Sequence, residues 1–182
     1  MKTTLITALV VGITTLSFPI PTNLTLENSP IPNHVIEIEI EKTDLQLFLY
    51  SLGKYESNNS YTKVNKWGYL GKYQFSKKTL RGLGYKVEPQ QFLDNPQLQE
   101  QAVMDLLIDN KRVMSKHISK HKNQTINNIK ITESGILAAA HLVGPRAVKR
   151  YLNSKGKRIK KDALGTSVED YMKHFGGYNL EL

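Results

Sequence analysis

Glu56 is the carboxylate in this sequence whose neighbours best suit it to chemistry. Serine, amide and aromatic side chains follow it in the stretch Tyr55 to Tyr61, and the stretch Trp67 to Phe75 adds further aromatic residues. Cleavage of a glycosidic bond needs a carboxyl group that keeps its proton near neutral pH. Apolar and aromatic neighbours favour the protonated form, because they disfavour the charged one. Glu56 is therefore the candidate general acid.

The element that must carry Glu56 is a helix that begins after Thr43. Thr43 followed by Gln46 is a capping-box arrangement, and this helix is predicted to end near residues 53–55. Glu56 would then lie at or just past the end of a buried helix. We expect a loop or small hairpin from Asn58 to Gly71, because polar turn formers alternate there with aromatic residues. The apolar residues at helical spacing are Leu45, Phe48, Leu49 and Leu52.

Capping residues and helix breakers predict that the rest of the chain is mostly helical. The segment after Thr132 is apolar on nearly every face, which is typical of a helix in the middle of a domain. Gly144-Pro145 ends that helix and a short helix follows. The other predicted helices run from Ser76 to Leu83, from Asn95-Pro96 to about residues 118–120, and from Ser167 to Phe175.

Composition limits the class of protein. A chain of 182 residues is long enough for one domain with a core and short for two. The formal net charge of +9 favours a polyanionic partner or surface. The absence of cysteine excludes disulfides, thiolate nucleophiles and cysteine-based zinc sites.

The N-terminal part of the chain has the pattern of an export signal. Residues 1–22 combine a basic start, an apolar run of about a dozen residues and a Pro-containing exit, which predicts a signal peptide or an uncleaved N-terminal anchor. Residues 23–42 are predicted to be a linker or extended arm, with a short strand at His34 to Glu41 where isoleucine and glutamate alternate. The expected location is the periplasm or cell envelope, or outside the cell. The functional domain is expected at residues 43–182.

Three sequence blocks occur in the order found in the soluble lytic transglycosylases, which are related to goose-type lysozyme. They are Glu56-Ser57, then Gly71-Lys72-Tyr73-Gln74, then Ala140 to Val148 with its helix break, and Tyr171 follows on a later helix. The chain resembles this family over roughly residues 43–175. It departs from the family pattern at His141-Leu142, where the family carries a Tyr-Asn pair, and at Val168, where the family carries threonine.

The resemblance implies a mainly α, lysozyme-like fold with a small β-hairpin and an N-terminal extended arm. It also implies cleavage of the β-1,4 linkage between N-acetylmuramic acid and N-acetylglucosamine in peptidoglycan. Glu56 would act first as acid and then as base on the C6 hydroxyl of the sugar, giving a 1,6-anhydro product. The expected substrate-binding residues are Ser57, Gly71, Tyr73, Gln74, His141 and Tyr171.

A hydrolytic muramidase of the same fold would usually need a second carboxylate about 5 to 9.5 Å from the first. No such partner is close to Glu56 in the sequence, which favours the transglycosylase reaction. A non-catalytic peptidoglycan-binding protein of the cell envelope is a further alternative. The candidate second carboxylates are Asp94, Glu133 and Asp162, although Glu133 after the cap Thr132 also suits a first helical turn.

The histidine and lysine patterns favour simpler interpretations than a metal or nucleic-acid site. His117 and His121 are four residues apart, which suits a solvated helix face better than half a zinc site, so we expect no metal and no cofactor. No nucleic-acid-binding motif is present, and we expect no nucleic-acid partner. A basic cluster is expected to be a solvated surface or to attract an anionic envelope polymer. Its members are Lys149, Arg150, Lys155, Lys157, Arg158, Lys160 and Lys161.

Overall fold

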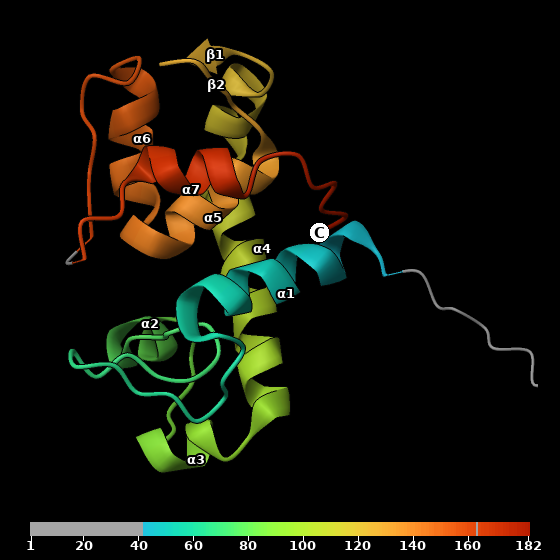
Figure 1. The fold of residues 1–182 in the computed structure, drawn as a ribbon, viewed down its shortest axis with the longest axis vertical. Helices are drawn as coiled ribbons and strands as arrows, with labels where there is room; N and C mark the ends of the chain where they lie inside the picture. Colours follow the sequence, from blue (N-terminus) through green and yellow to red (C-terminus); the bar gives the residue numbers. More distant parts are fainter. Residues whose placement is uncertain (1–41, 163) are drawn as a thin grey trace, which may run out of the picture. The chain divides into compact units, whose positions relative to one another are not determined.

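The computed structural model describes residues 42–182 except residue 163. This part of the chain forms seven helices, of which the long helix α4 (Pro96–His121) runs through the middle, and a single two-stranded antiparallel sheet (Figure 1). The helices are α1 (Asp44–Ser57), α2 (Lys77–Gly82), α3 (Pro89–Leu93), α4 (Pro96–His121), α5 (Glu133–Val143), α6 (Pro145–Asn153) and α7 (Val168–His174). The strands are β1 (Thr125–Ile126) and β2 (Ile129–Lys130).

The prediction of a mainly α fold with a small hairpin is confirmed, and of the two alternatives for residues 58–71, a loop or a small hairpin, the structure shows the loop. The predicted region, 58–71, forms only isolated bridges, in which Leu70 pairs with Val64 and Phe75. β1 and β2 are joined instead by Asn127 and Asn128, which both have positive φ. Two such residues give the tight turn whose twist matches paired strands. The predicted signal segment, the arm and the strand at His34 to Glu41 lie outside the described residues, except for Lys42 at the end of the arm.

Side-chain caps set the starts of the predicted helices. Thr43, Ser76, Asn95, Thr132 and Ser167 each accept a hydrogen bond from a backbone N–H in the first turn of the helix that follows. These five predicted starts are therefore confirmed. The short helix α3 was not predicted.

Helix α1 is longer at its C-terminal end than the sequence indicated. It continues to Ser57, and Asn58 then adopts the left-handed conformation that ends it. Gly53, which marked the predicted end, lies inside the helix at a close contact, since a Cβ there would be 2.4 Å from Oδ1 of Asn59. Glu56 consequently belongs to the last turn of α1.

Helix α5 is the most completely buried helix, as the sequence predicted. All residues from Ser134 to Ala140 are buried. Gly135 lets α7 approach closely, because a Cβ there would lie 2.9 Å from the carbonyl oxygen of Met172. Among the described residues, no helix combines the length and the apolar composition needed to cross a membrane.

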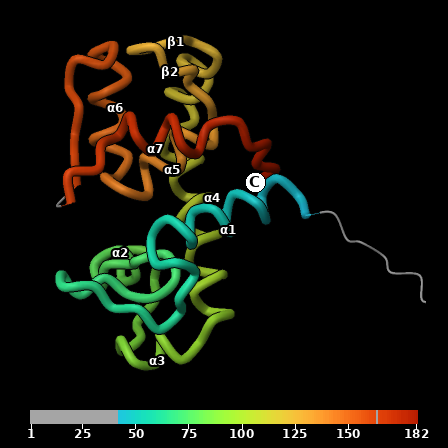
Figure 2. Tube along the Cα trace, in the orientation of Figure 1, coloured from blue at the N-terminus to red at the C-terminus, as the bar shows by residue number. Residues whose placement is uncertain are grey.

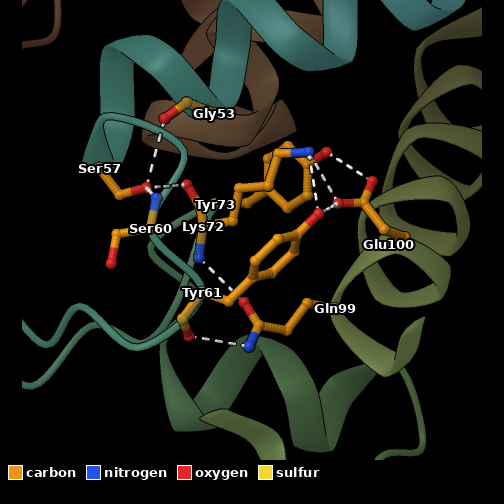
Figure 3. Close-up of polar contacts among 8 residues, drawn as sticks. All are labelled: Gly53, Ser57, Ser60, Tyr61, Lys72, Tyr73, Gln99 and Glu100. Carbon is orange, nitrogen blue, oxygen red and sulfur yellow. Dashed lines mark hydrogen bonds and ion pairs between the residues drawn. The ribbon is translucent and has the colours of Figure 1, made fainter. Parts of the chain in front are cut away.

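The loop of residues 58–75, whose path Figure 2 shows, is tied to the helical part of the structure by Gln99 of α4 (Figure 3). The side chain of Gln99 is fully buried, and its Nε2 donates to the carbonyl oxygens of Tyr61 at 3.0 Å and Phe92 at 2.9 Å. Its Oε1 accepts from the backbone N–H of Lys72 at 2.9 Å. Gly71 passes so close that a Cβ at that position would be 2.0 Å from Oε1. The loop can therefore reach Gln99 only if residue 71 is glycine.

The variant Gly71→Ala is expected to lower the free energy of unfolding more than Gly68→Ala. Both positions have positive φ, which costs an alanine roughly 1–2 kcal/mol. Only at residue 71 does the added methyl group also meet Gln99, since nothing lies within 4 Å of a Cβ at Gly68. Urea unfolding of both variants measures the difference. Equal losses of stability would show that the contact between Gly71 and Gln99 does not constrain the loop.

Candidate active site

The carboxyl group of Glu56 is largely withdrawn from water and is held at one oxygen. Its side chain is 14% exposed, and its Oε1 accepts a hydrogen bond from the hydroxyl of Tyr171 on α7. Nε2 of His141, on α5, lies 3.6 Å from the same oxygen. Among the described residues, no group hydrogen-bonds to Oε2. Three helices thus converge on one carboxyl group and leave its second oxygen available.

Tyr171 is a buried support for Glu56 rather than part of the surface. It is 2% exposed, and its ring packs edge-on against Tyr55 and at a tilt against Phe175, with centroid distances of 5.2 and 5.1 Å. Burial, and then the negative charge of Glu56, raises the pKa of the Tyr171 hydroxyl. The hydroxyl therefore keeps its proton and donates a hydrogen bond to Oε1 of Glu56.

His141 stands at the position where the resembled family carries tyrosine. Its side chain is 6% exposed, and its ring meets the ring of Phe75 edge-on at a centroid distance of 6.0 Å. Nδ1 is buried and has no hydrogen-bond partner among the described residues. A hydrogen placed on Nε2 would point toward Glu56, whereas a hydrogen on Nδ1 would be buried without an acceptor. The tautomer with the hydrogen on Nε2, directed toward Glu56, is therefore the favoured one.

Glu56 and His141 open into a cleft that is lined by exposed aromatic residues. Trp67 and Tyr69 are 43% and 40% exposed, so their rings are accessible to a ligand in the cleft. Oδ1 of Asn65 accepts hydrogen bonds from the backbone N–H groups of both residues and fixes their loop. The remaining lining residues are Gln74, Leu142, Asp162 and Leu164.

Asp162 is the candidate second carboxylate that the structure brings into the cleft. Its Oδ1 accepts from the backbone N–H groups of Leu164 at 2.9 Å and Thr166 at 2.8 Å, which closes a tight loop. The other two candidates lie elsewhere. Glu133 forms ion pairs with Lys111 and Lys122, and Asp94 accepts a hydrogen bond from Gln90 on the exposed side of α3; neither lines the cleft.

The predicted substrate-binding residues divide into two groups. Gln74 and His141 line the cleft with Glu56, and Tyr171 touches Glu56 from behind. Ser57, Gly71 and Tyr73 do not line it. The hydroxyl of Ser57 is buried and donates within the chain, while Gly71 packs on Gln99. All three residues are buried, and the contacts that the structure shows for them lie within the chain.

Tyr73 belongs to a polar cluster around Glu100 of α4, on the inner side of the loop (Figure 3). Tyr73 is fully buried, and its hydroxyl donates to Oε2 of Glu100 at 2.7 Å. Tyr61 and Lys72 both reach Oε1, also at 2.7 Å. Burial acts to raise the pKa of Glu100, but the hydrogen bonds from Lys72, Tyr61 and Tyr73 outweigh it and hold the pKa below its usual value. The cluster therefore fastens the loop to α4 through a charged carboxylate.

Sequence reasoning missed several residues of the cleft for identifiable reasons. Trp67 was expected near Glu56 as a wall, but Asn65 carried no signal beyond its turn-forming type. Leu164 is 68% exposed and its place at the cleft depends on the loop that Asp162 closes. The sequence signal that could have extended the prediction to the whole loop was the tryptophan, Trp67, about a dozen residues after the candidate acid.

The stabilisation by Glu100 is expected to depend on pH. Because the pKa of Glu100 is lowered in the folded state, its contribution is present above the unfolded value of about 4.3 and is lost as the pH falls through the folded value. The variant Glu100→Gln should therefore be less stable than the wild type at neutral pH, and the difference should shrink below about pH 4. Urea unfolding across this range measures it. Glu181→Gln, at an exposed site, is the matched control. A loss of stability in Glu100→Gln that did not change with pH would contradict the role of the charge on Glu100.

No group of three or more His, Asp or Glu side chains that could hold a metal ion occurs among the described residues. His117 and His121 stack on one another, with ring centroids 6.3 Å apart.

Comparison with protein-family models, with curated proteins and with solved structures finds no match to this chain. The function of the protein is therefore inferred from the residues that line the cleft.

Proposed function

We propose that this protein is a lytic transglycosylase that cleaves the β-1,4 linkage between N-acetylmuramic acid and N-acetylglucosamine in peptidoglycan. The observation that carries the proposal is the carboxyl group of Glu56 in the lining of a cleft that exposed aromatic residues share. Its Oε1 is held by Tyr171 and its Oε2 has no hydrogen-bond partner among the described residues. This is the arrangement that a general acid for a glycosidic oxygen needs.

The proposed reaction uses Glu56 twice. Protonated at Oε2, it gives its proton to the glycosidic oxygen as the bond between that oxygen and C1 breaks. The resulting carboxylate then takes the proton of the C6 hydroxyl, and O6 of the same sugar bonds to C1 to close the 1,6-anhydro ring. Glu56 ends the cycle protonated, so the reaction consumes no water and needs no second carboxylate.

The composition of the cleft supports a sugar substrate. Trp67 and Tyr69 present exposed rings, which can pack on the apolar faces of pyranose rings while their polar edges stay in water. Nε2 of Gln74 is engaged with the carbonyl oxygen of Gly71 at 2.8 Å, so its Oε1 is the atom left to accept from a sugar hydroxyl or amide. Together these groups offer stacking and a hydrogen-bond acceptor beside the proposed acid.

The variant Glu56→Gln tests the proposal directly. It is expected to reduce the release of soluble muropeptides from purified peptidoglycan by at least about a hundredfold, the low end of what a general acid contributes. Glutamine keeps the acceptor for Tyr171, so the unfolding midpoint should change little. Glu181→Gln is the control, since that side chain is exposed and outside the cleft.

Wild-type activity in the Glu56→Gln variant would overturn the enzymatic proposal. A wild-type protein that binds peptidoglycan without releasing any fragment would favour the non-catalytic envelope-binding alternative instead. Binding to insoluble peptidoglycan should be measured on both proteins beside the release of fragments. The two measurements separate a loss of chemistry from a loss of affinity.

A hydrolytic muramidase is the second candidate, and the place of Asp162 in the same cleft favours it. Since Oδ1 of Asp162 is used by its own loop, Oδ2 is the oxygen that could activate a water molecule. In that reaction water, rather than O6, would bond to C1. The product would then be a reducing sugar instead of an anhydro sugar.

The mass of the released muropeptides and the variant Asp162→Asn together distinguish the two reactions. The transglycosylase proposal predicts products lighter by one water, and an activity in Asp162→Asn within about threefold of wild type, because no base for water is needed. Asparagine retains Oδ1 for the two loop N–H groups, so the loop should persist. Reducing products whose formation falls at least about a hundredfold in Asp162→Asn would establish hydrolysis.

A further inference from the structure

Almost all of the net positive charge of the chain comes from one segment. Residues 146–161 contain eight lysine and arginine residues and no aspartate or glutamate, against a net charge of +9 for the whole chain. Among the described residues, none of these eight cations forms an ion pair. A charge density of this kind without internal partners favours an external polyanion.

Four of these cations surround one hollow at the C-terminal end of α6. The hollow is lined by Arg150, Asn153, Ser154, Lys155, Lys157 and Arg158, and it shares no residue with the cleft of Glu56. Every lining residue is polar or charged. The four cations are exposed to water, so an entering ligand can reach all of them without a rearrangement of the core.

The turn that presents the cations is well anchored. The hydroxyl of Ser154 accepts from the backbone N–H of Arg158 at 3.0 Å and donates to the carbonyl oxygen of Tyr151 at 3.0 Å. Gly156 is buried, with φ of +82°, and its carbonyl oxygen accepts from Nδ2 of Asn127. The backbone that carries the cations is therefore fixed before any ligand arrives, which reduces the entropic cost of binding.

The chemistry of the hollow selects among anionic ligands. Arginine binds phosphate through paired N–H groups and lysine acts as a point charge, and the hollow contains both. It has no aromatic residue on which the bases of a single-stranded nucleic acid could stack. It also has no apolar residue that could enter a lipid layer. A flexible polymer with phosphodiester groups and no bases fits these properties best.

We propose that the hollow at the end of α6 binds an anionic phosphodiester polymer of the cell envelope. The envelope setting rests on the proposed function, whereas the affinity of the hollow for the polymer does not. From Lys157 the chain continues through Lys160 and Lys161 to Asp162 at the cleft. A polymer strand held at the hollow would thus attach the protein to the wall beside its substrate.

The test measures the binding of a linear poly(glycerol phosphate) to the full chain carrying Glu56→Gln, which removes turnover. Two triple variants are compared on that background: Lys155→Gln with Lys157→Gln and Arg158→Gln, and the control Lys77→Gln with Lys78→Gln and Arg81→Gln. Both sets remove three exposed cations, so the total charge of the two proteins is equal. The control cations lie on and beside α2, away from the hollow.

The hollow variant is expected to bind at least tenfold more weakly than the control. The slope of the logarithm of the binding constant against the logarithm of the salt concentration should also become smaller in magnitude by about 2. This is because each of the three lost phosphate contacts contributes roughly 0.7. Equal affinities of the two triple variants, or no binding by either and by the parent, would overturn the proposal. Tighter binding of a DNA duplex or of anionic lipid vesicles than of the polymer would overturn the assignment of the partner. If the wild-type protein released no muropeptides from peptidoglycan, only the proposed function would be contradicted. The binding of the polymer is measured independently of that activity.

Discussion

The contact between the hydroxyl of Tyr171 and the carboxyl group of Glu56 joins two helices that are 115 residues apart in the chain, and the candidate site depends on it. A carboxyl group that is largely removed from water loses much of its solvation, and this loss must be offset by protein groups. Tyr171 supplies a hydrogen bond from a position that α7 can hold only by packing on α5. The close approach at Gly135 permits that packing. The chemistry at Glu56 is therefore supported by the core.

The other wall of the cleft is a loop that has little regular structure of its own. Its position comes from two neighbouring residues of α4: Gln99, which binds the loop backbone, and Glu100, which binds its side chains (Figure 3). Gln99 is fully buried, where a polar group without a partner costs about 1–3 kcal/mol, whereas the side chain of Glu100 is 36% exposed and holds the loop through three side-chain hydrogen bonds. The exposed rings of Trp67 and Tyr69 can face solvent because the opposite side of the loop is fastened in this way.

The cleft and the basic hollow are separate surfaces, and their side chains suit different kinds of ligand. The cleft offers one withdrawn carboxyl group, exposed rings and a few polar atoms, which suits an uncharged sugar ring. The hollow offers four cations on an anchored turn, which suits repeated negative charge. The hollow, at residues 150–158, directly precedes in sequence the loop of Asp162 and Leu164 that lines the cleft.

The sequence alone determined the helices, their caps and the identity of the candidate acid, because these depend on local periodicity and on side chains three residues apart. Glu56, Gln74 and His141 were predicted from their types and order, and they lie at one cleft. The tertiary structure decided the rest. It turned Ser57 and Tyr73 inward and brought Asp162 to the cleft from more than a hundred residues away. Which side chain reaches a cleft depends on the packing of distant helices and on the loop anchored by Gln99, and no local pattern carries that information.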